Sequence, residues 1–336
     1  MGGRRAEEDL RVASVKKSIA GGSGSAAGLE VVLPHPGTSR PTGMTRFLEN
    51  ERLLACLLLA PTVILLGLFI AYPFVKGVWL SLTSATVGNP GQFLGLSNYV
   101  KIWNDSIFQR AAYNTFVYTA IATVGKLTLG MWLALLLNRH FRGKRLVRAS
   151  MLLPFIVPTV LSTFAWKWMF DPTFSVLNWT LYHFGFIQTR IGWLTDPVMA
   201  MGSVILVNIW RGMPFYAITL LAGLQTVNPE LHEAAALDGA TAWQRFWRIT
   251  WPLLLPVTMV VTLFSVIQTF ADFQLVYVLT GGGPANATHL FATYAYQIGI
   301  NTGLLGEGAA VSLAMFPILF IIVVIQLWYI RRVEGA

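Results

Sequence analysis

Six long apolar stretches constrain this chain more than any other feature of its sequence. Each is about 20 residues or longer, the length that an α-helix needs to cross the hydrocarbon core of a bilayer. Backbone polar groups inside a bilayer must be satisfied within the protein, so each stretch is expected to be a helix. The expected spans are residues 53–75, 113–137, 151–170, 198–224, 253–279 and 309–330.

The composition agrees with an all-α integral membrane protein. Of the 336 residues, 55% are hydrophobic and only 12% are charged, which is more apolar than a soluble domain. The net charge is +9, but its placement argues against a nucleic-acid surface, because five basic residues lie between Arg139 and Arg148 without an acidic one. Such a cluster between two apolar stretches is typical of a cytoplasmic loop.

Alternation of the spans from this loop gives the expected topology. It places the N-terminal tail, the segment 225–252 and the pair Arg331-Arg332 in the cytoplasm. Residues 1–50 are rich in Gly, Ser and Pro and lack the apolar core of a signal peptide, so they are expected to be a disordered tail. Residues 51–336 then form the membrane domain.

Local signals in the segment 225–252 predict two short helices joined by a sharp turn. Asn228 before Pro229 is a helix start, because an N-cap side chain accepts from free backbone N–H groups and proline is tolerated in the first turn. Gly239 can take the left-handed conformation that ends a helix. Thr241 and Gln244 have the spacing of a capping box, which opens the second helix.

This segment resembles the EAA loop of ABC-type importer permeases. Its pattern is Glu233-Ala234-Ala235, three residues, Gly239, nine residues, Ile249, two residues and Pro252. In that family the loop docks a separate ATPase. The resemblance assigns the coupling role to Glu233, Ala234, Ala235, Asp238 and Gly239.

Other segments are similar to the maltose-type sugar permeases within the ABC importers. They cover the chain from about Leu53 onward, and two are the most specific: residues 210–215, Trp-Arg-Gly-Met-Pro-Phe, and residues 279–284, Leu-Thr-Gly-Gly-Gly-Pro. The resemblance implies the type I importer permease fold of six transmembrane helices with a cytoplasmic coupling loop. It also implies a location in the inner membrane, with both termini cytoplasmic.

The resemblance implies partners as well. They are a second permease subunit, an ABC ATPase dimer, an extracytoplasmic solute-binding protein, a sugar substrate and membrane lipid. No Lys-Ser or Lys-Thr follows the glycines of residues 281–283 with P-loop spacing, so this subunit is expected to have no ATPase site, with ATP bound by the partner. The histidines are far apart in sequence, and neither a metal nor a catalytic residue is expected.

Polar residues inside the spans are candidates for function, because they are costly in a membrane. Ser265, Gln268, Thr269 and Asp272 follow spacings of three and four residues, which puts them on one helical face. In the maltose-type family the matching positions line the substrate site, as do those matching Arg211, Gly212 and Phe215.

Structural roles are the alternatives for these polar residues. Hydrogen bonding between helices is common for Ser, Thr and Gln in membranes. For Arg211, a structural bond to a backbone carbonyl or to Asp272 is favoured over substrate contact. Lys126 is expected to snorkel or to pair across helices.

Rival functions follow from the same residues. A permease for glycerol phosphate or another charged solute would suit Arg211 and the positive net charge. A self-powered secondary transporter or channel would need its own coupling-ion site, for which Asp272 is the candidate, and would leave the coupling loop unexplained. A membrane-embedded enzyme is disfavoured, since the sequence shows no nucleophile-base pair or metal set.

The tail offers a first test. A chain that starts at Met44 is expected to insert and to support transport as well as the full chain, because the removed residues have too little apolar surface to pack. Uptake and expression of the truncated chain should be measured together. Lost uptake at normal expression would show that the tail has a function.

Overall fold

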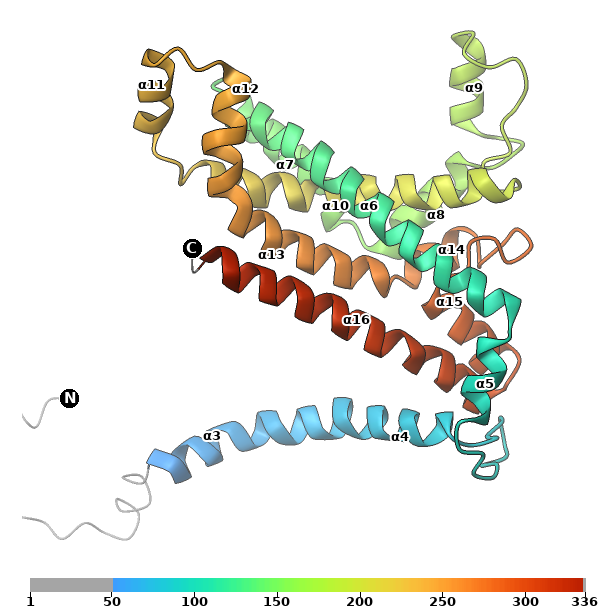
Figure 1. The fold of residues 1–336 in the computed structure, drawn as a ribbon. Helices are drawn as coiled ribbons and strands as arrows, with labels where there is room; N and C mark the ends of the chain where they lie inside the picture. Colours follow the sequence, from blue (N-terminus) through green and yellow to red (C-terminus); the bar gives the residue numbers. More distant parts are fainter. Residues whose placement is uncertain (1–50, 335–336) are drawn as a thin grey trace, which may run out of the picture. The chain divides into compact units, whose positions relative to one another are not determined.

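The computed structural model describes residues 51–334, and this range is mostly helical (Figure 1). Extended pairing among these residues is limited to two isolated bridges, Thr83–Phe93 and Thr86–Asn89. The predicted tail, residues 1–50, lies outside the described residues. The chain divides into two units, one up to Ile64 and one from Leu65. The all-α prediction is confirmed.

Within residues 51–334, five helices are long and apolar enough to cross a membrane. They are Leu54–Ser81, Ser106–Asn138, Pro197–Leu224, Ala242–Phe270 and Leu305–Arg332. The first of these helices consists of α3 (Glu51–Leu66), the π-helix η1 (Gly67–Ala71) and α4 (Tyr72–Ser81). The second is α6 (Ser106–Asn138), and the third is α10 (Pro197–Leu224). The fourth joins α12 (Ala242–Arg245), η2 (Phe246–Thr250) and α13 (Trp251–Phe270), and the last is α16 (Leu305–Glu334).

The expected third span, residues 151–170, is not one straight helix. It is a pair, α7 (Lys144–Ile156) and α8 (Thr159–Met169), bent by 92°. The break falls at Val157 and Pro158, where Val157 is extended with φ −65° and ψ 132°. A proline disfavours the helical conformation of the residue before it, which explains the position of the bend. Counted as one broken span, the pair brings the total to six.

The expected fifth span, residues 253–279, is also interrupted. Its helix ends at Phe270, and a separate short helix, α14 (Gln274–Leu279), follows after three residues. The backbone N–H of Leu275 donates to Asp272 Oδ1 at 3.3 Å. An Asp side chain that bonds nearby backbone in this way favours a helix end over a continuing helix.

Close packing of α6 against α10 organises the centre of the unit that starts at Leu65. A Cβ on Gly130 would come within 3.2 Å of the backbone nitrogen of Ala217, and one on Gly125 would collide with the side chain of Ile209. Small residues let membrane helices approach closely. Tyr118 on α6 and Val204 on α10 accordingly share one buried apolar cluster.

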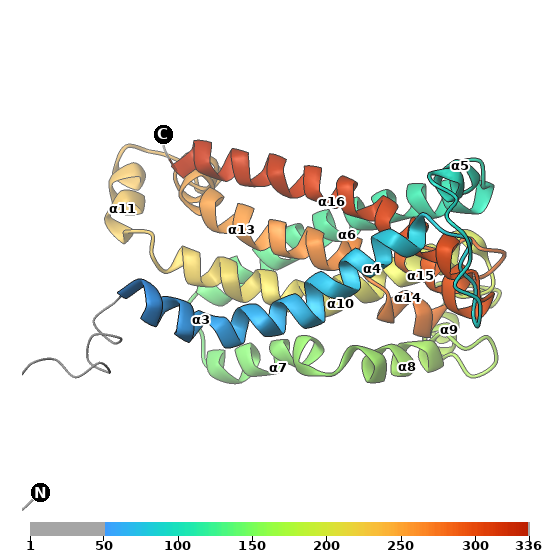
Figure 2. The ribbon, with the colours of Figure 1, turned by 90° about the horizontal axis from the view of Figure 1, so that it is seen from below.

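The connections of this unit gather at two ends (Figures 1 and 2). One end holds α11 (Pro229–Leu237), the loop from α6 to α7 and the last turns of α16. The opposite end holds α5 (Ser97–Trp103), α9 (Val176–His183), α15 (Phe291–Tyr296) and the π-helix η3 (Gln297–Asn301). Alternating spans predict this grouping.

Candidate functional site

The seven residues assigned to substrate from the sequence surround a single cavity of about 620 Å³. They come from α10, α13 and the break that follows α13. These residues are Arg211, Gly212, Phe215, Ser265, Gln268, Thr269 and Asp272. The helical spacing of three and four residues explains why each helix contributes several of them. Their role in binding substrate stays a prediction.

Asp272 is held by three donors. Its Oδ2 accepts from the Tyr118 hydroxyl at 2.7 Å and from Asn208 Nδ2 at 3.2 Å, while Oδ1 accepts from the Leu275 N–H. Asp272 therefore ties α6 and α10 to the end of the fifth span. Because a buried polar group that loses a hydrogen-bond partner is costly, these three bonds make Asp272 an anchor between the elements.

Arg211 does not take the structural role favoured from the sequence. Its Nε has no hydrogen-bond partner in residues 51–334, and the one ion pair of that range joins Lys101 to Glu307. The expected bond to Asp272 is not observed, and that carboxyl group accepts from Tyr118, Asn208 and the Leu275 N–H. Arg211 instead lines the cavity.

Lys126 reaches the cavity across α10. Its Nζ donates to Thr269 Oγ1 at 2.6 Å, and the residue is buried. A Cβ on Gly212 would collide with the Lys126 side chain, so the missing side chain of Gly212 leaves the lysine its path. Of the two roles expected for Lys126, pairing across helices is the one observed.

Two residues of the network were not found by sequence reasoning. Tyr118 and Asn208 hold the Asp272 carboxylate, and both are buried. Asn208 carried a usable signal, because it lies one helical turn before Arg211 in an apolar run. Tyr118 carried none, since its partner is 154 residues away in sequence.

The coupling segment has the conformation that its sequence predicts. The Asn228 side chain accepts from Glu230 N–H at 3.0 Å and opens α11. Gly239 has φ +80°, and Thr241 forms the capping box with Gln244. Glu233, Ala234 and Ala235 lie in α11, with Asp238 at its C-cap. Glu233, Ala234, Asp238 and Gly239 are exposed, and Ala235 is partly buried.

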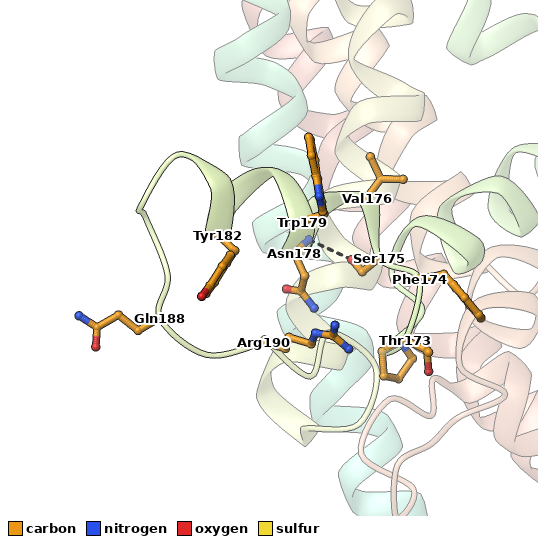
Figure 3. Close-up of a pocket in the computed structure, with 10 residues that line it drawn as sticks. Thr173, Phe174, Ser175, Val176, Asn178, Trp179, Tyr182, Gln188 and Arg190 are labelled. Atoms are coloured by element: carbon orange, nitrogen blue, oxygen red, sulfur yellow. Dashed lines mark hydrogen bonds between the residues drawn. The ribbon is translucent and has the colours of Figure 1, made fainter.

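A second cavity, of about 640 Å³, lies at α9 (Figure 3). Asn178 is one of its lining residues, and it donates to the Ile191 carbonyl at 2.9 Å and accepts from the Trp193 ring N–H at 3.0 Å. Trp179 and Tyr182 are exposed at its edge. Sequence reasoning assigned no role to this pocket, and none of the seven residues lies in it.

Residues 126–335 match the family model described as a binding-protein-dependent transport system inner membrane component. The chain belongs to this family. The matched region contains the coupling segment and all seven candidate substrate residues. The protein is therefore a membrane subunit of a transport system that works with a binding protein.

Individual relatives agree with this family. The chain is 38% identical over 290 residues to the sulfoquinovosyl glycerol transport system permease protein SmoG of Agrobacterium fabrum, covering 85% of this chain and 94% of that protein. It is 33% identical to the trehalose/maltose transport system permease protein MalF of Thermococcus litoralis, covering 84% of this chain and 96% of that protein.

Solved structures confirm the fold. A chain from the crystal structure of a bacterial ABC transporter involved in the import of the acidic polysaccharide alginate aligns with a TM-score of 0.74 at 24% identity. The alignment covers 86% of this chain and 98% of that chain. The resemblance drawn from the coupling loop and the fold class expected from it are both confirmed.

The Asp272 anchor gives a testable prediction. Tyr118→Phe is expected to lower the stability of the purified protein by about 1–3 kcal/mol, because it removes a hydrogen-bond partner from a buried polar group. Tyr113→Phe is the matched control, since Tyr113 lies on the same helix with its side chain 70% exposed. Thermal unfolding in detergent measures both. Equal melting of the two variants would contradict the anchor.

Proposed function

We propose that this chain is the permease subunit of an ABC importer for a sugar or a sugar-like solute, and that it forms half of the translocation pathway. The observation that carries the proposal is the convergence of the seven residues on one cavity inside the membrane helices. The names of relatives that carry sugars support the same class of substrate.

The cavity offers the groups that a sugar needs. Buried atoms without a partner among the described residues include Asn208 Oδ1 and Ser265 Oγ, which can bind hydroxyls. Gln268 adds both a donor and an acceptor. Phe215, stacked on Phe155 with ring centroids 5.5 Å apart, supplies an apolar face for the C–H surface of a ring. Apolar walls with a few placed polar groups are typical of small-molecule sites.

The proposed assembly contains four kinds of subunit. This chain pairs with a second permease subunit, an ABC ATPase dimer docks at the coupling segment and binds the ATP, and an extracytoplasmic binding protein delivers the substrate. The Arg139–Arg148 loop, the coupling segment and both termini lie on the cytoplasmic side, as the positive-inside rule favours. In this assembly the ATPase dimer alone is expected to hydrolyse ATP.

Alternating access follows from the helix connections. Closure of the ATPase dimer moves α11, and the turn at Gly239 passes the movement to the helix Ala242–Phe270. That helix carries Ser265, Gln268 and Thr269 at its other end, so the cavity walls move with the coupling segment. Rigid movement of packed elements is a common way to switch between two states.

A self-powered secondary transporter is the weaker candidate. Such a protein needs a coupling-ion site, and the carboxylate expected to provide it, Asp272, is already bonded to Tyr118, Asn208 and Leu275 N–H. It would also leave the exposed coupling segment without a role.

Coupling is tested at Gly239. Gly239→Val is expected to strain the left-handed turn by roughly 1–2 kcal/mol and so to abolish uptake and ATPase co-purification while the protein still inserts. Gly88→Val is the matched control, because Gly88 has φ +81° against +80° at Gly239 and both have open space around them. Unchanged uptake and co-purification in Gly239→Val would show that the docking role is wrong.

A further inference from the structure

The charges around the membrane cavity do not balance. Two basic residues, Lys126 and Arg211, line it, and Asp272 is the single acidic residue among its lining residues. The Asp272 carboxyl group accepts hydrogen bonds from the Tyr118 hydroxyl, the Asn208 amide and the Leu275 N–H. Neither basic side chain forms an ion pair within residues 51–334. The cavity therefore has an excess of positive charge.

Lys126 and Arg211 both lie in membrane helices, where burying a charged group costs free energy. Lys126 is only 3% exposed, and its ammonium has one recorded partner, the neutral hydroxyl of Thr269. Arg211 leaves its buried Nε without a partner among the described residues. Charged groups inside membrane segments are rare, and they normally pair with an opposite charge or mark a substrate path.

The surrounding residues position both basic groups at the cavity. Gly212 leaves the room that the Lys126 stem needs to cross α10, and Thr269 fixes the position of its ammonium. Arg211, one residue before Gly212, brings a planar guanidinium to the same cavity. A guanidinium binds carboxylate or phosphate through paired hydrogen bonds, while an ammonium acts as a point charge beside it.

We propose that Lys126 and Arg211 form an anion subsite, and that the substrate is a sugar carrying an acidic group such as a carboxylate, sulfonate or phosphate. The proposal rests on the proposed function and names its substrate class. The acidic group supplies the missing negative charge, while the hydroxyls bind Ser265, Gln268 and Asn208 Oδ1.

Glucuronate and glucose are matched probes, because they differ at one carbon, a carboxylate against a neutral hydroxymethyl group. Equilibrium binding of each to the purified membrane complex, without the binding protein, is measured at low and high salt. Glucuronate is expected to bind at least tenfold more tightly, which is about 1.4 kcal/mol. The preference should shrink with salt and should be lost in Lys126→Met and Arg211→Gln.

Two further variants keep the test independent of folding. Lys126→Arg retains the charge and is expected to keep most of the preference. Lys101→Met removes the same charge from an exposed ion pair outside the cavity and is expected to keep all of it.

Several results would contradict the anion subsite. Equal binding of both probes, tighter binding of glucose, or an unchanged preference in Lys126→Met and Arg211→Gln would overturn the anion subsite and leave the sugar function standing. Binding of neither probe would also overturn it. Uptake of labelled sugars by intact cells then decides separately whether the sugar function fails.

Discussion

The buried carboxylate of Asp272 is the interaction on which the cavity depends. It accepts hydrogen bonds from Tyr118 on α6, from Asn208 on α10 and from the backbone of α14. These bonds hold the end of the fifth span against the two most closely packed helices. The break after Phe270 separates α14 from α13, and the polar lining residues Gln268, Thr269, Asp272 and Gln274 come from α13, the break and the start of α14. The anchor thus joins α6, α10 and α14 beside the cavity.

Helical periodicity and helix-capping signals predicted part of the cavity lining and the coupling segment. The spacing of Ser265, Gln268 and Thr269 placed them on one face, and the capping signals gave α11, the turn at Gly239 and the start of α12. These features depend on neighbours in sequence, so a single chain is enough to find them. The break at Pro158 was also readable, but counting apolar residues ignores the conformational limit that a proline puts on the residue before it.

Contacts between residues far apart in the chain could not be predicted from the sequence. No local pattern joins Tyr118 to Asp272 or predicts that Gly212 makes room for Lys126. The bond from Arg211 to Asp272, one of the two structural bonds favoured from the sequence, is not observed. Asp272 accepts instead from Tyr118, Asn208 and the Leu275 N–H. The excess of positive charge in the cavity rests on its two basic lining residues against one acidic residue.

Access to Gln268 tests most directly whether the cavity is the transport path. Because Cys56 is the only cysteine, Gln268→Cys in a Cys56→Ser chain gives a single thiol at the cavity, and Val260→Cys gives a control on the same helix outside it. A membrane-impermeant thiol reagent is applied to the complex from each side, with and without ATP. The account predicts that the thiol of the Gln268→Cys variant reacts from one side at a time, that ATP changes the reactive side, and that the Val260→Cys control stays unreactive. Labelling of the Gln268→Cys variant that is absent, or that ignores ATP, would contradict it.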